Sequence, residues 1–261
     1  MRKLAVTVAW LLGFGVLCAD GDPIVFVPSA SHLTVSSDVK FSSARMYRGR
    51  REMSKVCEFK VEISERISEE MHVYAGLNAV MEIKCGTANN ASPYCGIIYN
   101  FLGCCTADFG YIRHFYTSLP SCVRRCTNEI YVGLCANVPL SPSLYCFYDF
   151  IRDEFAAECK IGQRFWWSET RLNGFSVYLG AEIGWDRAQH PFGVSDTLKK
   201  GSGYCYYSVD ADLIYAFSEN AKASIGVFYG GNLSGSKSWA NGGGRTKRSN
   251  TWLTASANCS F

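Results

Sequence analysis

Apolar and polar residues alternate along most of the chain. The clearest stretch, 175–185, has Phe, Val, Leu, Ala, Ile and Trp at every second position and Ser, Tyr, Gly and Glu between them. A period of two is that of a β-strand with one apolar and one polar face. Such segments recur at 38–47, 56–64, 72–84, 94–102, 107–116, 129–138, 144–151, 155–166, 175–185, 204–217, 222–229 and 252–261. We therefore expect an all-β protein of about twelve strands.

The last of these segments ends the sequence on Phe261, with no turn residue or polar tail after it. An open edge strand invites aggregation, whereas the last strand of a closed barrel pairs with the first. Segments of roughly 9–13 residues also suit strands that cross a membrane at a tilt. The pattern therefore predicts an antiparallel up-and-down transmembrane β-barrel, in which 252–261 pairs with 38–47.

The connections between the segments vary in length. Counted from the first hairpin, the even-numbered ones are short: 65–70, 103–105, 138–143, 167–173 and 218–221. Four odd-numbered ones are longer, at 85–93, 118–127, 186–203 and 230–249, although those after the first and seventh segments are not. Outer-membrane barrels show this asymmetry between periplasmic turns and outside loops.

The N-terminus has the features of a secretory signal. Met1-Arg-Lys precedes a mostly apolar run, Leu4 to Leu17, and small Ala19 precedes a polar residue. We predict a signal peptide at 1–19, a short periplasmic leader at 20–37 and a barrel at 38–261. The apolar run is shorter than the roughly 20 residues of a membrane-spanning helix. An exported barrel of this kind is expected in the outer membrane, in contact with lipid and lipopolysaccharide.

Composition adds limits on the chemistry. Aromatic residues make up 14% of the chain, with 24 Gly and 7 Pro, which suits β-structure with glycine-bearing turns. The net charge of +3 is too small to indicate nucleic-acid binding. Six of the 13 cysteines share the apolar face of a strand, where free Cys acts as a small hydrophobe: Cys57, Cys95, Cys146, Cys159, Cys205 and Cys259. Cys122 and Cys126 flank a loop and are the disulfide candidate. We expect neither a metal nor a cofactor, because the sequence has no Cys-x-x-Cys and no tight Cys/His cluster.

In such a barrel the polar face of each strand lines the interior. The expected lumen-lining residues are Glu58, Lys60, Glu62, Asn78, Glu82, Lys84, Asp108, Glu129, Asn137, Asp149, Glu158, Lys160, Arg164, Glu182, Asp210, Asp212 and Lys222. Acids outnumber bases among them, 10 to 5. They indicate a narrow channel for small polar solutes or ions that mildly favours cations.

Three alternatives remain open from the sequence. The interior charges could pair with one another and plug the lumen, leaving a structural barrel whose basic loops (48–51, 124–125 and 237–248) meet lipopolysaccharide or a partner. A secreted soluble β-sandwich would also contain alternating strands. A membrane-embedded hydrolase is disfavoured, because His114 has no evident Ser partner and the sequence contains no Gly-x-Ser-x-Gly or His-Glu-x-x-His.

Two stretches carry a resemblance to a known family. Met46-Tyr-Arg-Gly49 is similar to the Tyr/Phe-Arg-Gly that ends the first strand in a family of bacterial outer-membrane barrels of unestablished function. The run 128–150 resembles that family's central hairpin, with a Glu-x-Tyr strand, a Pro-x-Ser-Pro turn and a Tyr-Asp strand. The cysteines depart from the family pattern, and no catalytic residue can be carried over. Phe261 resembles the C-terminal assembly signal of such barrels, which implies the barrel-assembly machinery as a partner.

Overall fold

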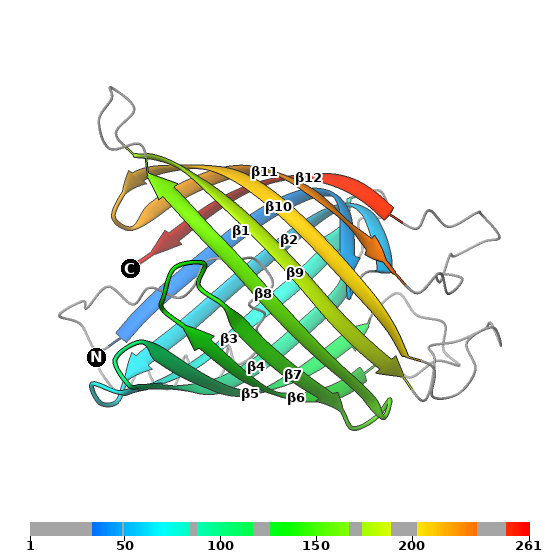
Figure 1. Ribbon diagram of the computed structural model, residues 1–261, viewed down its shortest axis with the longest axis horizontal. Coiled ribbons are helices and arrows are strands. Elements are labelled where there is room, and N and C mark those ends of the chain that lie inside the picture. Colours follow the sequence, from blue (N-terminus) through cyan, green and yellow to red (C-terminus); the bar gives the residue numbers. More distant parts are fainter. Residues whose placement is uncertain are drawn as a thin grey trace.

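The computed structural model describes residues 33–48, 50–83, 88–116, 126–166, 174–188, 203–233 and 249–261. They form one closed antiparallel barrel with the sheet order β1-β12-β11-β10-β9-β8-β7-β6-β5-β4-β3-β2 (Figure 1). Its strands are β1 Leu33–Tyr47, β2 Arg50–Arg66, β3 Met71–Glu82, β4 Ala88–Phe101, β5 Cys105–Tyr116, β6 Cys126–Ala136, β7 Ser143–Asp149, β8 Glu154–Trp166, β9 Phe175–Ala188, β10 Gly203–Ser218, β11 Ala221–Asn232 and β12 Ser249–Ser260. The predicted twelve-stranded barrel is confirmed, and a β-sandwich is excluded. Within these residues, no helix is long and apolar enough to cross a membrane.

The C-terminal strand closes the barrel as predicted. β12 pairs with β1 from Ser36 opposite Ser260 to Ser42 opposite Thr254. Beyond the ladder, the Phe261 N–H donates to the Val35 carbonyl at 2.8 Å, and the Val35 N–H donates to the Phe261 carbonyl at 2.9 Å. β1 begins at Leu33 and takes in the last part of the predicted leader, because Leu33 and Thr34 pair with β2 and the residues after them pair with the chain end as well. The rest of the leader and the predicted signal peptide lie outside the described residues.

β4 begins earlier than the sequence pattern indicated. The polar stretch before Pro93 was expected to be a loop, yet β4 starts at Ala88. Asn90 and Ser92 are each only 3% exposed, and the Ser92 hydroxyl donates to Asn90 Oδ1 at 2.9 Å. A strand of a barrel with a polar interior tolerates these side chains on its inner face, so polarity alone does not mark a loop here.

The outer face of the barrel is apolar and exposed. Phe109 is 53% exposed, Leu179 48% and Ile225 67%, although all three lie within strands. Residues on either side of them along the strand face inward, so the two faces have the predicted parity. A surface of this kind is suited to hydrocarbon, because lipid solvates the side chains that a soluble protein would bury.

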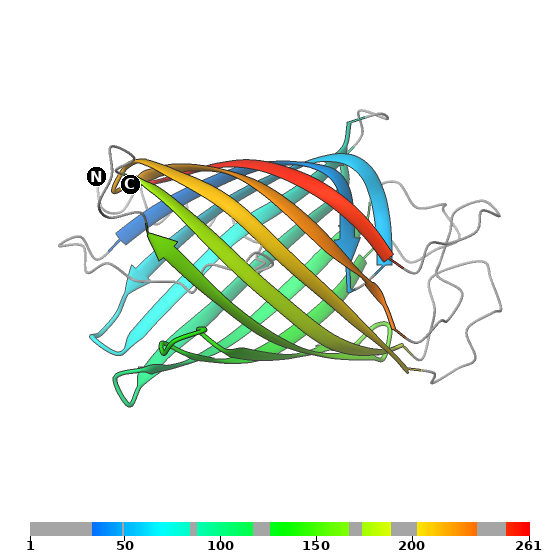
Figure 2. The ribbon, with the colours of Figure 1, turned by 45° about the horizontal axis from the view of Figure 1, so that its top comes forward.

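The tip of the β1–β2 hairpin leaves the barrel wall. β1 stops pairing with β12 at Ser42, and β2 stops pairing with β3 at Val56, while β1 and β2 stay paired with each other up to Tyr47 opposite Arg50. The register shifts between Arg45 and Met46, where the pairing is irregular. We call residues 44–48 and 50–54 the inner hairpin. Figure 2 shows the blue strands bending inward at the end of the barrel away from the C-terminus.

Candidate functional site in the barrel interior

The structure places most of the predicted lumen residues on the inner face. Asn78, Asp108, Glu129, Asp149 and Glu158 are buried there. Nine half-buried members of the set pair across strands with buried residues or lie two positions from them: Glu58, Lys60, Glu62, Glu82, Lys160, Arg164, Glu182, Asp210 and Asp212. Lys222, also half-buried, lies opposite Asn258 and has the strand parity of buried Gly226 and Phe228.

Two members of the predicted set stand apart. Asn137 is not on the inner face. It follows the end of β6, it is exposed, and its N–H donates to the Cys104 carbonyl at 2.7 Å in the neighbouring turn. The alternation of apolar and polar residues continues one step past the strand end in the sequence, which is why the sequence predicted an inward-pointing Asn137. Lys84 lies outside the described residues, as does Cys122, so the Cys122–Cys126 disulfide stays a prediction.

One half of the interior is filled by aromatic and aliphatic side chains. A buried cluster on β3 to β8 comprises Tyr74, Tyr94, Ile98, Ile112, Tyr131, Phe147 and Ala156. The tyrosine hydroxyls of this cluster and of the adjacent Tyr145 donate hydrogen bonds to nearby carboxylates. Tyr74 Oη donates to Asp108 Oδ1 at 2.6 Å, Tyr145 Oη donates to Asp108 Oδ2 at 3.3 Å, and Tyr94 Oη donates to Glu62. This side of the barrel is therefore a packed core.

The other half of the interior carries a half-exposed polar strip beside a smaller buried cluster of Ala44, Phe228 and Trp252. We call this strip the polar lane. It lies on the inner face of β10, β11, β12 and β1 and is lined by Asp38, Lys40, Asp210, Asp212, Lys222, Ser256 and Asn258. All seven are only partly buried. The Asp210 carboxylate lies over Gly180 and that of Asp212 over Gly226, where an added Cβ would come within 2.5 Å and 1.9 Å of their oxygens. The glycines thus leave room for the acids to lie along the wall.

At the end of the barrel that holds the inner hairpin, Arg48 reaches across the interior. Its Nη2 donates to Glu129 Oε2 at 2.8 Å, its Nη1 lies 3.6 Å from Glu154 Oε1, and its Nε lies 4.0 Å from Glu158 Oε1. The guanidinium carbon is 4.9 Å from the centre of the Phe147 ring. These partners come from β6, β7 and β8. Since β7 is the strand farthest from β1 in either direction around the barrel, the arginine bridges opposite walls.

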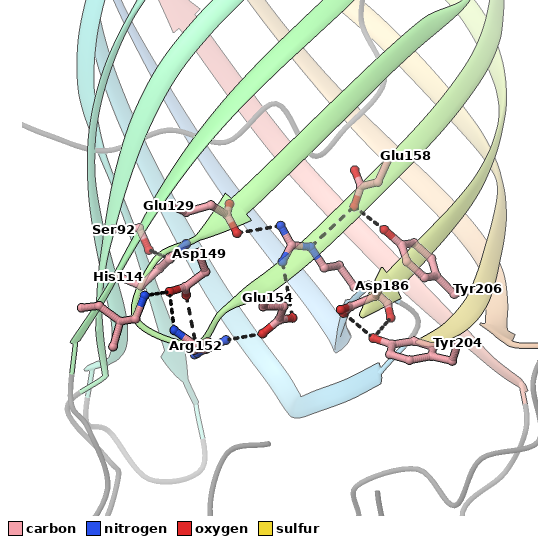
Figure 3. A network of polar contacts seen from close by, with 12 residues as sticks. Ser92, His114, Glu129, Asp149, Arg152, Glu154, Glu158, Asp186, Tyr204 and Tyr206 are labelled. Carbon is pink, nitrogen blue, oxygen red and sulfur yellow. Dashed lines mark hydrogen bonds and ion pairs between the residues drawn. The ribbon is translucent and has the colours of Figure 1, made fainter. Parts of the chain in front are cut away.

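Neighbouring groups hold these carboxylates in place (Figure 3). Arg152, in the β7–β8 turn, lies 3.7 Å from Asp149 and 3.6 Å from Glu154. Tyr206 Oη donates to Glu158 Oε1 at 2.5 Å. Lys160 Nζ lies 3.3 Å from Glu158 on its other side. The acids are thus fixed by charge-assisted contacts from several strands, which stabilises their geometry.

The backbone of the inner hairpin is held as well. Tyr204 Oη, on β10, donates to the Arg48 carbonyl at 2.9 Å and lies 2.7 Å from Asp186 Oδ2. Asp186 and Tyr204 face each other across β9 and β10. Sequence reasoning placed Asp186 in a loop and Arg48 in a solvated turn, so it missed this contact.

His114 has a serine partner that the sequence did not reveal. Ser92 Oγ lies 2.9 Å from His114 Nδ1, and the two residues come from adjacent strands, β4 and β5. Both side chains are 3% exposed. A nucleophile and base must reach a substrate, and these two are enclosed by the packed half of the interior. Over the described part of the chain, no group of three or more His, Cys, Asp or Glu side chains is arranged to hold a metal ion.

Comparison with known proteins agrees with this architecture. Residues 158–261 match a family described as Helicobacter outer membrane protein. No curated protein matches the chain. The matched segment runs from β8 through the closing strand β12, and it supports an outer-membrane β-barrel family.

Several solved structures share the fold. A NanC porin structure has a TM-score of 0.52 at 13% identity, covering 85% of this chain and 98% of that chain. An outer-membrane channel from Pseudomonas putida F1 has a TM-score of 0.51 at 9% identity, covering 93% and 100%. A KdgM porin in complex with disordered oligogalacturonate has a TM-score of 0.50 at 13% identity, covering 87% and 99%. At such identities the likeness concerns the fold alone. The closed barrel, its apolar outer face and the family match together identify the chain as a β-barrel protein of the outer membrane.

Proposed function

We propose that the protein is a narrow channel for small polar solutes or ions, and that the polar lane is its path. The observation that carries this proposal is the asymmetry of the interior. Inner residues of β3 to β8 form a buried cluster, whereas the inner faces of β10, β11, β12 and β1 carry the half-exposed polar residues of the lane beside a smaller buried cluster of Ala44, Phe228 and Trp252. Eight strands leave an interior just filled by side chains, and about 16 leave an open channel. A twelve-stranded barrel filled on one side fits a narrow eccentric path.

The charges of the lane favour cations. Asp38, Asp210 and Asp212 face the lane with Lys40 and Lys222. Asp210 and Asp212 are two residues apart on one strand, so their carboxylates lie on the same face and their negative electrostatic potentials add. Charges that line a pore in this way set its ion preference. The solved NanC and KdgM porins and the Pseudomonas channel are consistent with a conducting role for this architecture.

Conductance across planar lipid bilayers tests the proposal. We expect small, steady, ohmic steps and a reversal potential that favours cations in a salt gradient. Asp212→Asn should reduce that preference, and Asp210→Asn together with Asp212→Asn should reduce it further. Glu69→Gln removes an exposed charge in the β2–β3 turn and should leave the preference nearly unchanged. Folded protein that gives no current would contradict the proposal.

A plugged, structural barrel is the second candidate, and the Arg48 contacts specifically favour it. They close part of the cross-section by joining opposite walls. In a plugged barrel, Arg48 of the basic loop 48–51 is not available to lipopolysaccharide, because its side chain is 7% exposed and turned inward. The other expected basic loops, 124–125 and 237–248, lie outside the described residues. Current through the wild-type protein separates a channel from a plug.

We propose no enzymatic role. The Ser92–His114 pair is buried beside the packed half of the interior and serves to satisfy polar atoms of β4 and β5. Contact with the barrel-assembly machinery through β12 and Phe261 is proposed from the exposed terminal side chain, which is 79% exposed at the end of the closing strand.

A further inference from the structure

The partners of Arg48 on the far wall form a site without the inner hairpin, which itself contributes only the Tyr47 ring among the ring contacts described, 4.9 Å from the guanidinium carbon. Glu129 lies on β6, Phe147 on β7, and Glu154 and Glu158 on β8. These three strands pair in succession from Glu129 opposite Asp149 to Asp149 opposite Glu154. The site is therefore built into a continuous part of the barrel wall, on the side away from β1 and β2.

The occupant, in contrast, belongs to a hairpin that leaves the wall. Residues 44–47 and 50–54 lie beyond the ladders of β12 and β3, and their backbone pairing is with each other. The Arg48 guanidinium fastens the tip to the far wall, and the Tyr204 hydroxyl of β10 donates to the Arg48 carbonyl. The wall that binds the guanidinium and the hairpin that carries it thus come from different parts of the sheet.

The chemistry of the site is selective for a guanidinium group. Three carboxylates approach three different nitrogens of Arg48, at 2.8, 3.6 and 4.0 Å. The Phe147 ring lies 4.9 Å from the guanidinium carbon. A planar guanidinium presents several donors around one centre and stacks on aromatic rings, whereas an ammonium is a compact, strongly hydrated point charge. The wall therefore matches the shape of the cation as well as its charge.

We propose that this wall is a binding site for small solutes that carry a guanidinium group, such as arginine, and that Arg48 occupies it as a tethered competitor. A solute that binds replaces one positive charge by another and releases the inner hairpin from the far wall. The inference deepens the proposed channel, because it names a class of solute and a means of opening. Binding itself does not require conduction, so the two can be tested separately.

The test uses the full-length folded protein with Arg48→Ala, which empties the site. Thermal unfolding in detergent is measured with methylguanidinium, methylammonium, sodium and urea as separate additives. We expect Arg48→Ala to lower the unfolding temperature and methylguanidinium to restore it with saturation. Half-saturation should need at least about tenfold less methylguanidinium than methylammonium, since the site matches a planar fork. Arginine should act like methylguanidinium.

A double variant tests whether the Glu129 carboxylate is part of the binding site. Adding Glu129→Gln to Arg48→Ala removes the closest acid and should raise the half-saturating methylguanidinium concentration by at least about tenfold. If Arg48→Ala folds poorly, the yield of heat-shifted protein after refolding with each additive replaces the unfolding temperature. Equal responses to methylguanidinium, methylammonium and sodium, or no response to any of them, would overturn the proposed site.

Conductance keeps the two proposals apart. Larger steps in Arg48→Ala than in wild type, reduced again by methylguanidinium, support both the channel and the site. Saturable binding of methylguanidinium without current in either protein would leave the site standing and reject the channel. Current in both proteins without selective binding would reject the site and leave the channel standing.

Discussion

Gly96 on β4 should be intolerant of any side chain, because a tyrosine ring lies over it. Gly96 is opposite Tyr74 in the β3–β4 ladder. A Cβ at this position would lie 2.2 Å from Tyr74 Oη, 2.4 Å from Tyr74 Cζ and 2.7 Å from the Phe109 carbonyl oxygen. The carbonyl belongs to the β4–β5 pairing and cannot move freely. In Gly96→Ala the ring of Tyr74 must therefore shift.

The cost of that shift follows from what the ring touches. Tyr74 is 8% exposed, and its hydroxyl donates to Asp108 Oδ1 at 2.6 Å and contacts the Tyr131 hydroxyl. Loss of a buried hydrogen bond that leaves a partner unsatisfied costs about 1–3 kcal/mol. Overpacking of a dense core costs about 1–3 kcal/mol more. We expect Gly96→Ala to lower the free energy of unfolding by about 2–6 kcal/mol.

Urea unfolding of the protein in lipid vesicles, followed by tryptophan fluorescence, measures this loss. Gly103→Ala is the control: Gly103 has a φ of 65° but nothing within 4 Å, so only left-handed backbone strain of about 1–2 kcal/mol is expected. In a Tyr74→Ala background, Gly96→Ala should cost at least about 1 kcal/mol less than in the wild type. Equal costs in the two backgrounds would refute the argument that the ring is the obstacle.

The remaining predictions concern the closing strand and the Arg48 contacts. Deletion of Phe261 removes the two backbone hydrogen bonds to Val35. In purified protein refolded without the assembly machinery, it should reduce the heat-shifted fraction on gels far more than Phe261→Ala, which keeps these bonds. Similar losses in both variants would show that the ring matters more than the backbone. Glu129→Gln should lower the free energy of unfolding by about 3 kcal/mol, because it leaves Arg48 with a weakened buried pair. An unchanged urea midpoint would show that the pair contributes little to stability.

The alternation of residues was sufficient to predict the barrel and the strand that closes it. Inner and outer faces follow from a period of two, and that period is a local property of the chain. The predicted loop at 85–93 was wrong in its second half, where β4 begins at Ala88, because a polar run occurs both in loops and on the inner face of a strand. Asn90 and Ser92 are polar because they face the interior of a strand, yet a polar run of this kind is also what a loop would show.

The main feature of the site could not be predicted from local pattern. Arg48 and Glu129 are 81 residues apart in the sequence, and their contact depends on the hairpin bending away from the wall. That bend accompanies the irregular register at Arg45 and Met46, which side-chain alternation does not encode. The sequence did show an arginine in a short first connection where a long loop would be usual, and this shortness is the one signal that could have pointed to an unusual hairpin.

The pairing of β1 with β12 has a consequence for how the chain reaches its native state. Ser36 meets Ser260, so nearly the whole sequence lies between the two strands of this seam. Contacts at such separation form slowly, because the chain entropy of closing the loop opposes them until many other contacts exist. β1 is the first strand of the barrel to be synthesised. The edge of β1 that pairs with β12 nevertheless stays without a partner until the last residues of the chain have been made. An unpaired edge of this length is an aggregation hazard, so the period before closure is when the protein is most vulnerable.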